Sequence, residues 1–204
     1  MSDGFNRDKT VDSGGFRGLI PENTAVPVVL VDCTGKLVTI GKGDNAGRTA
    51  RLYSCTFEVA IGKYAGGRIW HDLWCNVEPD PAGGKPEAFG PHAMFCDLCD
   101  LAGLHDEESG YPLPENDDDM SKTCQGMVGT TAIINTGMRT FKRRDQTTGH
   151  ANTAKSFTAL SSEQKELVND AVALILQRVE KQKARQLERD QESGFTDEND
   201  EPIF

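Results

Sequence analysis

Regular alternation of apolar and polar residues over two neighbouring stretches predicts the centre of the fold. In residues 51–61 the apolar side chains occupy the odd positions, which are Tyr53, Cys55, Phe57, Val59 and Ile61. Successive side chains of a strand point to opposite faces, so this pattern predicts a half-buried strand with its odd positions inward. A glycine-rich turn, 62–67, leads into a second alternating strand over residues 68–77.

The second strand carries unusual residues on its less apolar face. Its inward positions are Ile69, His71, Leu73, Cys75 and Val77, and its outward positions are Arg68, Trp70, Asp72, Trp74 and Asn76. Large aromatic side chains normally lie in the core. Two tryptophans beside an arginine on the outer face therefore indicate a binding surface. The alternative is that either tryptophan packs beneath a helix.

Other segments complete the predicted secondary structure. Extended runs cover 25–32 and 36–40, as two strands or one bent strand, and 126–135, 138–144 and 153–160, the last two joined by a polar turn. Proline near the start and Gly103 at the end predict a short helix over 91–103. Ser161 and Gln164 have capping-box spacing at the start of a second, amphipathic helix, whose later half is polar. We interpret the acidic segment 105–122 as a loop.

This order of elements predicts a mainly β fold. Three strands, a helix and a closing hairpin are the order of an OB-fold-like five-stranded barrel with one inserted helix. A long C-terminal helix and a disordered acidic tail follow it. The predicted boundaries are a disordered N-terminal arm over 1–18, the OB-fold domain over 19–160, the helix over 161–190 and the tail over 191–204.

Charge is distributed unevenly along the chain. The formal net charge is −10, but seven acids lie between His105 and Asp119 and five more follow Gln191. The rest of the chain holds 20 acids against 22 bases, which leaves room for a nucleic-acid partner. The N-terminus lacks the apolar segment of a signal peptide, and six scattered cysteines indicate buried free thiols, so we expect a cytoplasmic protein.

Interleaved cations and aromatic rings on three strands predict a surface for single-stranded nucleic acid, because bases stack on aromatic faces while Lys and Arg contact phosphates. The candidate residues are Arg51, Arg68, Trp70, Trp74, Arg139, Phe141, Lys142, Arg143, Arg144, Lys155 and Phe157. For the basic segment from Arg139 to Lys155, the alternative is a solvated hairpin.

Two alternative functions rest on other residues. Cys96 and Cys99 have the spacing of a zinc-ligand pair, which His71, Cys75, His92 or Cys124 could complete in a zinc-stabilised interaction module. Because one such pair also fits the apolar face of a helix, buried thiols are the favoured interpretation, and no cofactor or metal site is predicted. Asp117, Asp118 and Asp119 could hold divalent ions in a nuclease. They lie in the predicted loop, and no catalytic motif is present, so we expect no enzyme activity.

The chain ends in an acidic run closed by two large apolar residues. Pro202, Ile203 and Phe204 follow Asp197, Glu198, Asp200 and Glu201. A free carboxylate beside an apolar tip suits capture in a pocket with a basic rim. This ending resembles the tail of bacterial single-stranded DNA-binding proteins, an acidic run closed by an Ile-Pro-Phe tip, here in the order Pro-Ile-Phe. The resemblance implies that the tail residues recruit replication and recombination proteins.

The body of the chain resembles a family of phage-encoded single-stranded DNA-binding proteins. The similarity covers roughly residues 19–160 and is carried by Phe57, by 62–73 and by the helix segment 94–103. It implies an OB-fold that coats single-stranded DNA in phage replication or recombination, inside the host cytoplasm. The polar half of the C-terminal helix is compatible with a homodimer.

Overall fold

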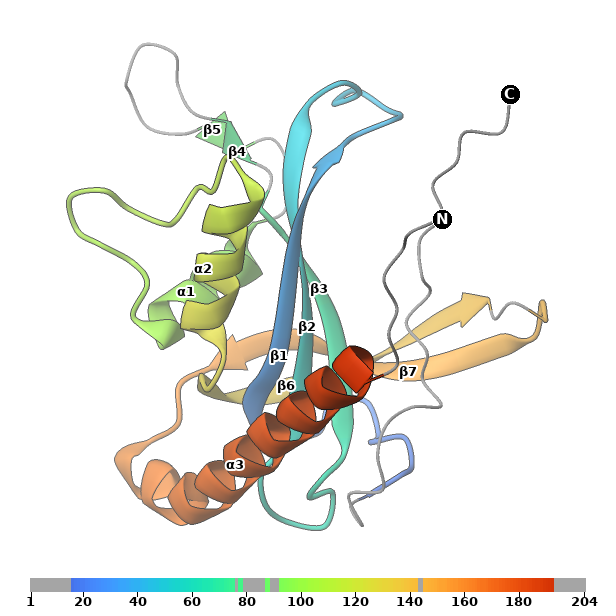
Figure 1. Cartoon of the computed structure of the whole chain (residues 1–204), viewed down its shortest axis with the longest axis vertical. Helices are drawn as coiled ribbons and strands as arrows, with labels where there is room; N and C mark the ends of the chain where they lie inside the picture. Colours follow the sequence, from blue (N-terminus) through green and yellow to red (C-terminus); the bar gives the residue numbers. More distant parts are fainter. Residues whose placement is uncertain (1–15, 76, 79–86, 89–91, 143–144, 193–204) are drawn as a thin grey trace.

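A curved antiparallel sheet and three helices form the protein (Figure 1). The computed structural model describes residues 16–75, 77–78, 87–88, 92–142 and 145–192. The long strands are β1 (Ala25–Thr39), β2 (Thr49–Val59), β3 (Arg68–Cys75), β6 (Thr131–Lys142) and β7 (Thr148–Thr158), and a short hairpin joins β4 (Val77–Glu78) to β5 (Glu87–Ala88). The helices are α1 (Ala93–Ala102), α2 (Asp117–Met127) and α3 (Ser162–Glu192). The mainly β class predicted from the sequence is confirmed.

The long strands lie in the order β3-β2-β1-β6-β7, and every neighbouring pair is antiparallel. β1 is therefore the central strand, and the segments predicted as two strands or one bent strand form this single element. The two end strands, β3 and β7, also touch each other: His71 Nδ1 lies 2.8 Å from Thr153 Oγ1, and the rings of His71 and Phe157 meet edge-on. The sheet thus curls until its ends are in contact.

Two irregularities in strand pairing change which side chains face the core. Along β1, Leu30 pairs with Phe57 but Asp32 pairs with Thr56, so Val31 is an extra residue. On β7, Ser156 and Ala154 pair with consecutive residues of β6, so Lys155 is extra. One extra residue reverses the alternation beyond it.

The main core fills the inside of the curled sheet, and helices α1 and α2 cover it. Four of the five predicted inward positions, Tyr53, Cys55, Phe57 and Val59, are buried in this core. The fifth, Ile61, lies beyond the end of β2 and packs with Val29 and Val31 outside this core. Tyr53 stacks on Phe95 of α1, with ring centroids 4.8 Å apart.

The prediction of one inserted helix is wrong, because part of the expected acidic loop forms α2. Asn116 caps this helix by accepting a hydrogen bond from the Asp119 backbone N–H at 2.9 Å. The acids that follow occupy the first turn, where the positive end of the helix dipole stabilises them. The predicted strand over 126–135 therefore begins later, at Thr131, and continues as β6 to Lys142.

Helix α3 packs on the outer face of the sheet. The predicted capping box is present: Ser161 Oγ accepts from the Gln164 N–H, and Gln164 Oε1 accepts from the Ser161 N–H. Val168 and Ile175 pack against Val29 and Val31 of β1 in a second apolar cluster. Beyond Val179 the helix is mostly exposed, as its polar sequence predicted.

The segment before β1 contacts the rest of the protein from its first described residue, Phe16, onward. Phe16 packs edge-on against Tyr64, and its N–H donates to the Ala65 carbonyl at 2.9 Å. Ile20 is fully buried, and Asn152 of β7 hydrogen-bonds both its N–H and its carbonyl, at 2.8 and 2.7 Å. Residues 1–15 of the predicted arm lie outside the described residues.

Candidate nucleic-acid interface

The outer face of β1, β2 and β3 is assembled from rows of side chains that strand pairing sets side by side. Beyond the part that α3 covers, the first row is Asp32, Thr56 and Trp70, the second is Thr34, Ser54 and Asp72, and the third is Lys36, Leu52 and Trp74. Directly paired residues of antiparallel strands point to the same side. We call these three rows the tryptophan face.

Both tryptophans reach the surface of this face. Trp74 is 37% exposed and Trp70 is half-buried, whereas the inward neighbours Ile69, Leu73 and Cys75 are buried. The predicted outward position of the two rings is therefore confirmed. Four residues of an extended strand separate them by about 13 Å, far enough for each ring to meet a different base.

Arg68 lies at the edge of the tryptophan face but is engaged in a buried ionic cluster. Its Nη2 is 2.7 Å from Oε2 of Glu58, and the other oxygen of Glu58 accepts a short hydrogen bond from Arg178 of α3. Glu58 is only 1% exposed. Arg68 therefore helps to fix α3 on the sheet, and much of its charge is already compensated.

Arg139 joins the β6–β7 hairpin to the tryptophan face. Its Nη1 lies 2.9 Å from Asp72 Oδ2, and Asp72 Oδ1 also accepts from Ser54. Farther along the hairpin, the ring of Phe141 lies across its partner Gly149, where an added Cβ would come within 2.4 Å of the ring. Lys142 is exposed at the end of β6, and Arg143 and Arg144 lie outside the described residues.

Three further predicted contact residues lie neither on this face nor on the part of the hairpin just described. Arg51 is 5% exposed, and its Nε donates a hydrogen bond to the Pro114 carbonyl at 2.6 Å. Its side chain therefore lies in the protein interior. Phe157 is buried against Phe57, because the extra residue Lys155 reverses the alternation that had grouped Phe157 with that lysine. Lys155 is exposed, but its amine bonds Asn23 and lies 3.9 Å from Glu22.

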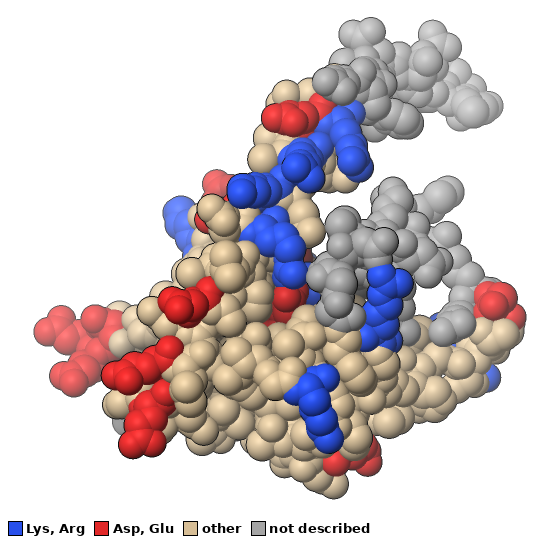
Figure 2. All heavy atoms as spheres, turned by 90° about the horizontal axis from the view of Figure 1, so that it is seen from below, with Lys and Arg blue, Asp and Glu red and all other residues tan. Residues whose placement is uncertain are grey.

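Sequence reasoning missed Lys36, which is exposed at the end of the row that contains Trp74. Only the register of three strands brings the two residues together. The acids of residues 105–119 lie elsewhere. Figure 2 shows Asp and Glu gathered on the side where α1 and α2 lie in Figure 1, away from the β6–β7 hairpin.

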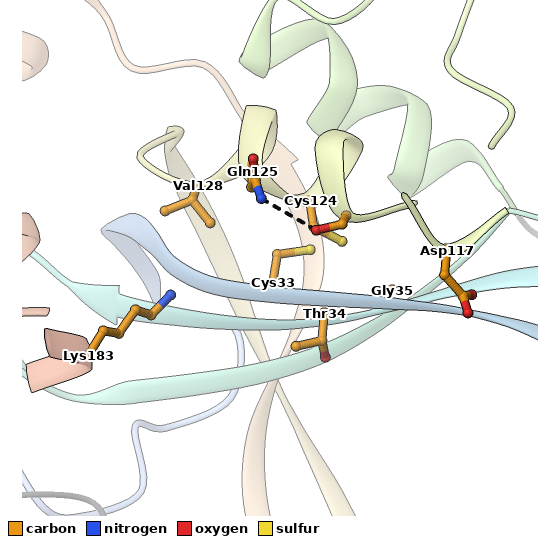
Figure 3. A pocket seen from close by; sticks show the side chains of 9 residues that line it. Cys33, Thr34, Gly35, Asp117, Cys124, Gln125, Val128 and Lys183 are labelled. Atoms are coloured by element: carbon orange, nitrogen blue, oxygen red, sulfur yellow. Dashed lines mark hydrogen bonds between the residues drawn. The ribbon is translucent and has the colours of Figure 1, made fainter. Parts of the chain in front are cut away.

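A cleft of about 350 Å³ lies between β1 and α2 (Figure 3). Cys33 and Cys124 point toward each other there, and Cys33 Sγ is 3.8 Å from Cys55 Sγ in the core. A hydrogen bond with Cys33, together with burial, raises the pKa of Cys124 well above its ordinary value. Lys183 at the rim pairs with Asp32 of the tryptophan face at 2.9 Å.

The two thiols of the proposed zinc-ligand pair differ in burial, because Cys96 is partly exposed and Cys99 is buried. Cys99 lies in the core, and burial raises the pKa of the nearby Cys75 to about 12. Among the residues that the structure describes, no three His, Cys, Asp or Glu side chains are grouped to hold a metal ion.

The acidic segment also gives no support to a nuclease site. Asp117, Asp118 and Asp119 form the first turn of α2, and hydrogen bonds from Lys122 and Asn116 lower the pKa of the Asp119 carboxyl. The position of these carboxylates at the start of α2 therefore gives them a structural role in the helix.

The predicted partner-binding residues Asp197, Glu198, Asp200, Glu201, Pro202, Ile203 and Phe204 lie outside the described residues. No described helix combines the length and the apolar character that a membrane span needs. Comparison with models of protein families, with curated proteins and with solved structures finds no match for this chain.

Proposed function

We propose that this chain binds single-stranded DNA without sequence preference, through the tryptophan face. The observation that carries the proposal is the pair Trp70 and Trp74 at the surface of a sheet, where large aromatic side chains are seldom placed. Stacking on such rings contributes about 1–3 kcal/mol per base and accepts every base. Lys36 in the face and Lys142 on the adjoining hairpin are exposed cations.

The topology supports the same proposal. Central β1 pairs with β2 and β6, the end strands touch, and helices lie between the third and fourth long strands. This is the arrangement we expect of a five-stranded OB-fold barrel, in which the face of strands 2 and 3 and the two adjacent hairpin loops bind oligonucleotides. The tryptophan face occupies the corresponding strands. In this proposal the protein coats unwound strands in phage replication or recombination, and its acidic tail recruits partner proteins.

The test is a titration of the full chain with oligo-dT, followed by tryptophan fluorescence over a salt series. Binding should quench the fluorescence and weaken as salt rises, because phosphate contacts release counterions. Absence of quenching, or an affinity indifferent to salt, contradicts the proposal. A parallel series with oligo-rU establishes whether DNA or RNA is preferred.

Variants at position 74 test the stacking itself, with labelled oligo-dT anisotropy as the readout. Trp74→Ala should weaken binding roughly 5- to 150-fold, the equivalent of 1–3 kcal/mol. Trp74→Phe keeps an aromatic face and should retain most of the affinity. Because Trp74 is partly exposed, both variants should fold, which circular dichroism checks. Equal affinity of Trp74→Ala and the wild type contradicts the role of the ring.

A further inference from the structure

Apart from Lys36, which belongs to the tryptophan face, the cations closest to this face are paired with protein carboxylates. Arg68 is paired with Glu58, Arg139 with Asp72, and Lys183 with Asp32. A surface that follows a nucleic-acid backbone needs cations that can meet phosphates. Exposed cations without such pairs lie on another part of the described surface.

The exposed half of α3 carries a row of cations on one side. Arg178, Lys181, Arg185 and Arg189 are spaced by three or four residues, which places them within about 80° of arc around the helix axis. Lys181, Arg185 and Arg189 are exposed, and none of them forms an ion pair with any described residue. Glu188 borders the row. We call these four residues the α3 basic row.

The α3 basic row begins at the tryptophan face. Its first member, Arg178, bonds Glu58, which also binds Arg68, two residues before Trp70 on β3. Lys183, at a different angle around the helix, reaches Asp32 of β1 instead. Arg185 and Arg189 follow Arg178 by about 10 and 16 Å along the helix axis. Figure 2 shows Lys and Arg side chains along the part of the molecule that stands away from its body, where the exposed half of α3 lies.

We propose that the α3 basic row is a second part of the DNA site, along which the phosphates of a bound strand continue after its bases leave Trp70. This inference rests on the proposed function and adds to it a path for the phosphates of the bound strand. Stacking on β3 holds the bases, and the row contributes charge without reading sequence. The bound DNA strand then crosses from the sheet to α3 beside Arg178, where the ionic cluster fixes the helix to the sheet.

The test compares the salt dependence of oligo-dT binding for the full chain and for Arg185→Gln/Arg189→Gln. Removing two phosphate contacts should reduce the slope of log affinity against log salt by ~1.4, since each contact to a single strand contributes ~0.7. The variant should bind more weakly at low salt and approach the wild type at high salt. Lys122→Gln/Lys165→Gln is the matched control, with the same change in net charge at exposed sites away from the row.

Three results overturn the inference. One is an unchanged slope in Arg185→Gln/Arg189→Gln while the wild type binds with a clear salt dependence. Another is an equal loss of slope in the control, which would indicate only a general effect of net charge. The third is an unchanged slope together with a lower mass of the variant in sedimentation equilibrium, which would identify the row as a contact between copies of the chain. If the wild type does not bind oligo-dT at all, the proposed function itself fails, and this result is distinct from the other three.

Discussion

Replacing Glu58 by Gln should show how much of the attachment of α3 depends on one buried carboxylate. Glu58 is 1% exposed and meets two guanidinium groups, Arg68 from β3 and Arg178 from α3. Glutamine keeps the shape of the side chain and removes its charge. The two arginines are then left close together without a counter-charge, at the boundary between helix and sheet.

The size of the effect follows from the burial of each partner. Removing one partner of a buried ion pair costs about 3–5 kcal/mol. The side chains of Arg68 and Arg178 are 22% and 31% exposed, so both can regain some hydration, and the lower end of that range applies. We expect a loss of about 3 kcal/mol in the free energy of unfolding. For a chain of this length, that corresponds to a fall of about 6–12 °C in Tm.

Urea unfolding followed by circular dichroism measures the loss, and Asp32→Asn is the matched control. The Asp32–Lys183 pair also joins the sheet to α3, but its side chains are 43% and 59% exposed, so breaking it should cost no more than about 1 kcal/mol. A double-mutant cycle with Arg178→Gln isolates the coupling between helix and sheet. If Glu58→Gln and Asp32→Asn are equally stable within about 0.5 kcal/mol, the argument from burial is refuted.

Two further predictions concern stability. Burial lowers the pKa of His71 to about 4 from 6.5. Between pH 6.5 and 4 the unfolded chain therefore binds a proton at this histidine that the folded protein does not bind. The free energy of unfolding should fall as the pH drops through this range, by at most roughly 3 kcal/mol. In urea titrations at several pH values, the stability of His71→Gln should depend less on pH than that of the wild type. An equal pH dependence in both would contradict the assigned role of His71. Asn116→Ala removes the cap of α2 and should cost about 1 kcal/mol in thermal unfolding, whereas Asn116→Asp should cost little.

Sequence periodicity predicted the parts of the fold in which the position of each residue depends only on its own strand or helix. The alternation in β2 and β3 and the Ser161 capping box were confirmed because one buried face and one local hydrogen-bond pattern determine them. Helix α2 was missed although Asn116, followed by acids, is a helix-start signal. The high density of charge there favoured a loop.

The candidate site was harder to predict because it depends on register and on partners distant in sequence. Nothing local to Lys155 marks it as an extra residue, so Phe157 was assigned to the wrong face. The carbonyl that binds Arg51 comes from Pro114, 63 residues later. Lys36 approaches Trp74 only through the pairing of three strands. Strand parity therefore identified the tryptophans, but the cations around them required the structure.

The contact between β3 and β7 has a consequence for behaviour at high concentration. A sheet with two free end strands offers unpaired backbone groups at both, and these invite pairing with strands of other molecules. Here the end strands lie against each other, with His71 beside Thr153 and Phe157. These contacts hold both end strands in the curved sheet, which limits their freedom to pair with a strand of another molecule. Copies of the chain are therefore less prone to join their sheets into aggregates at high concentration.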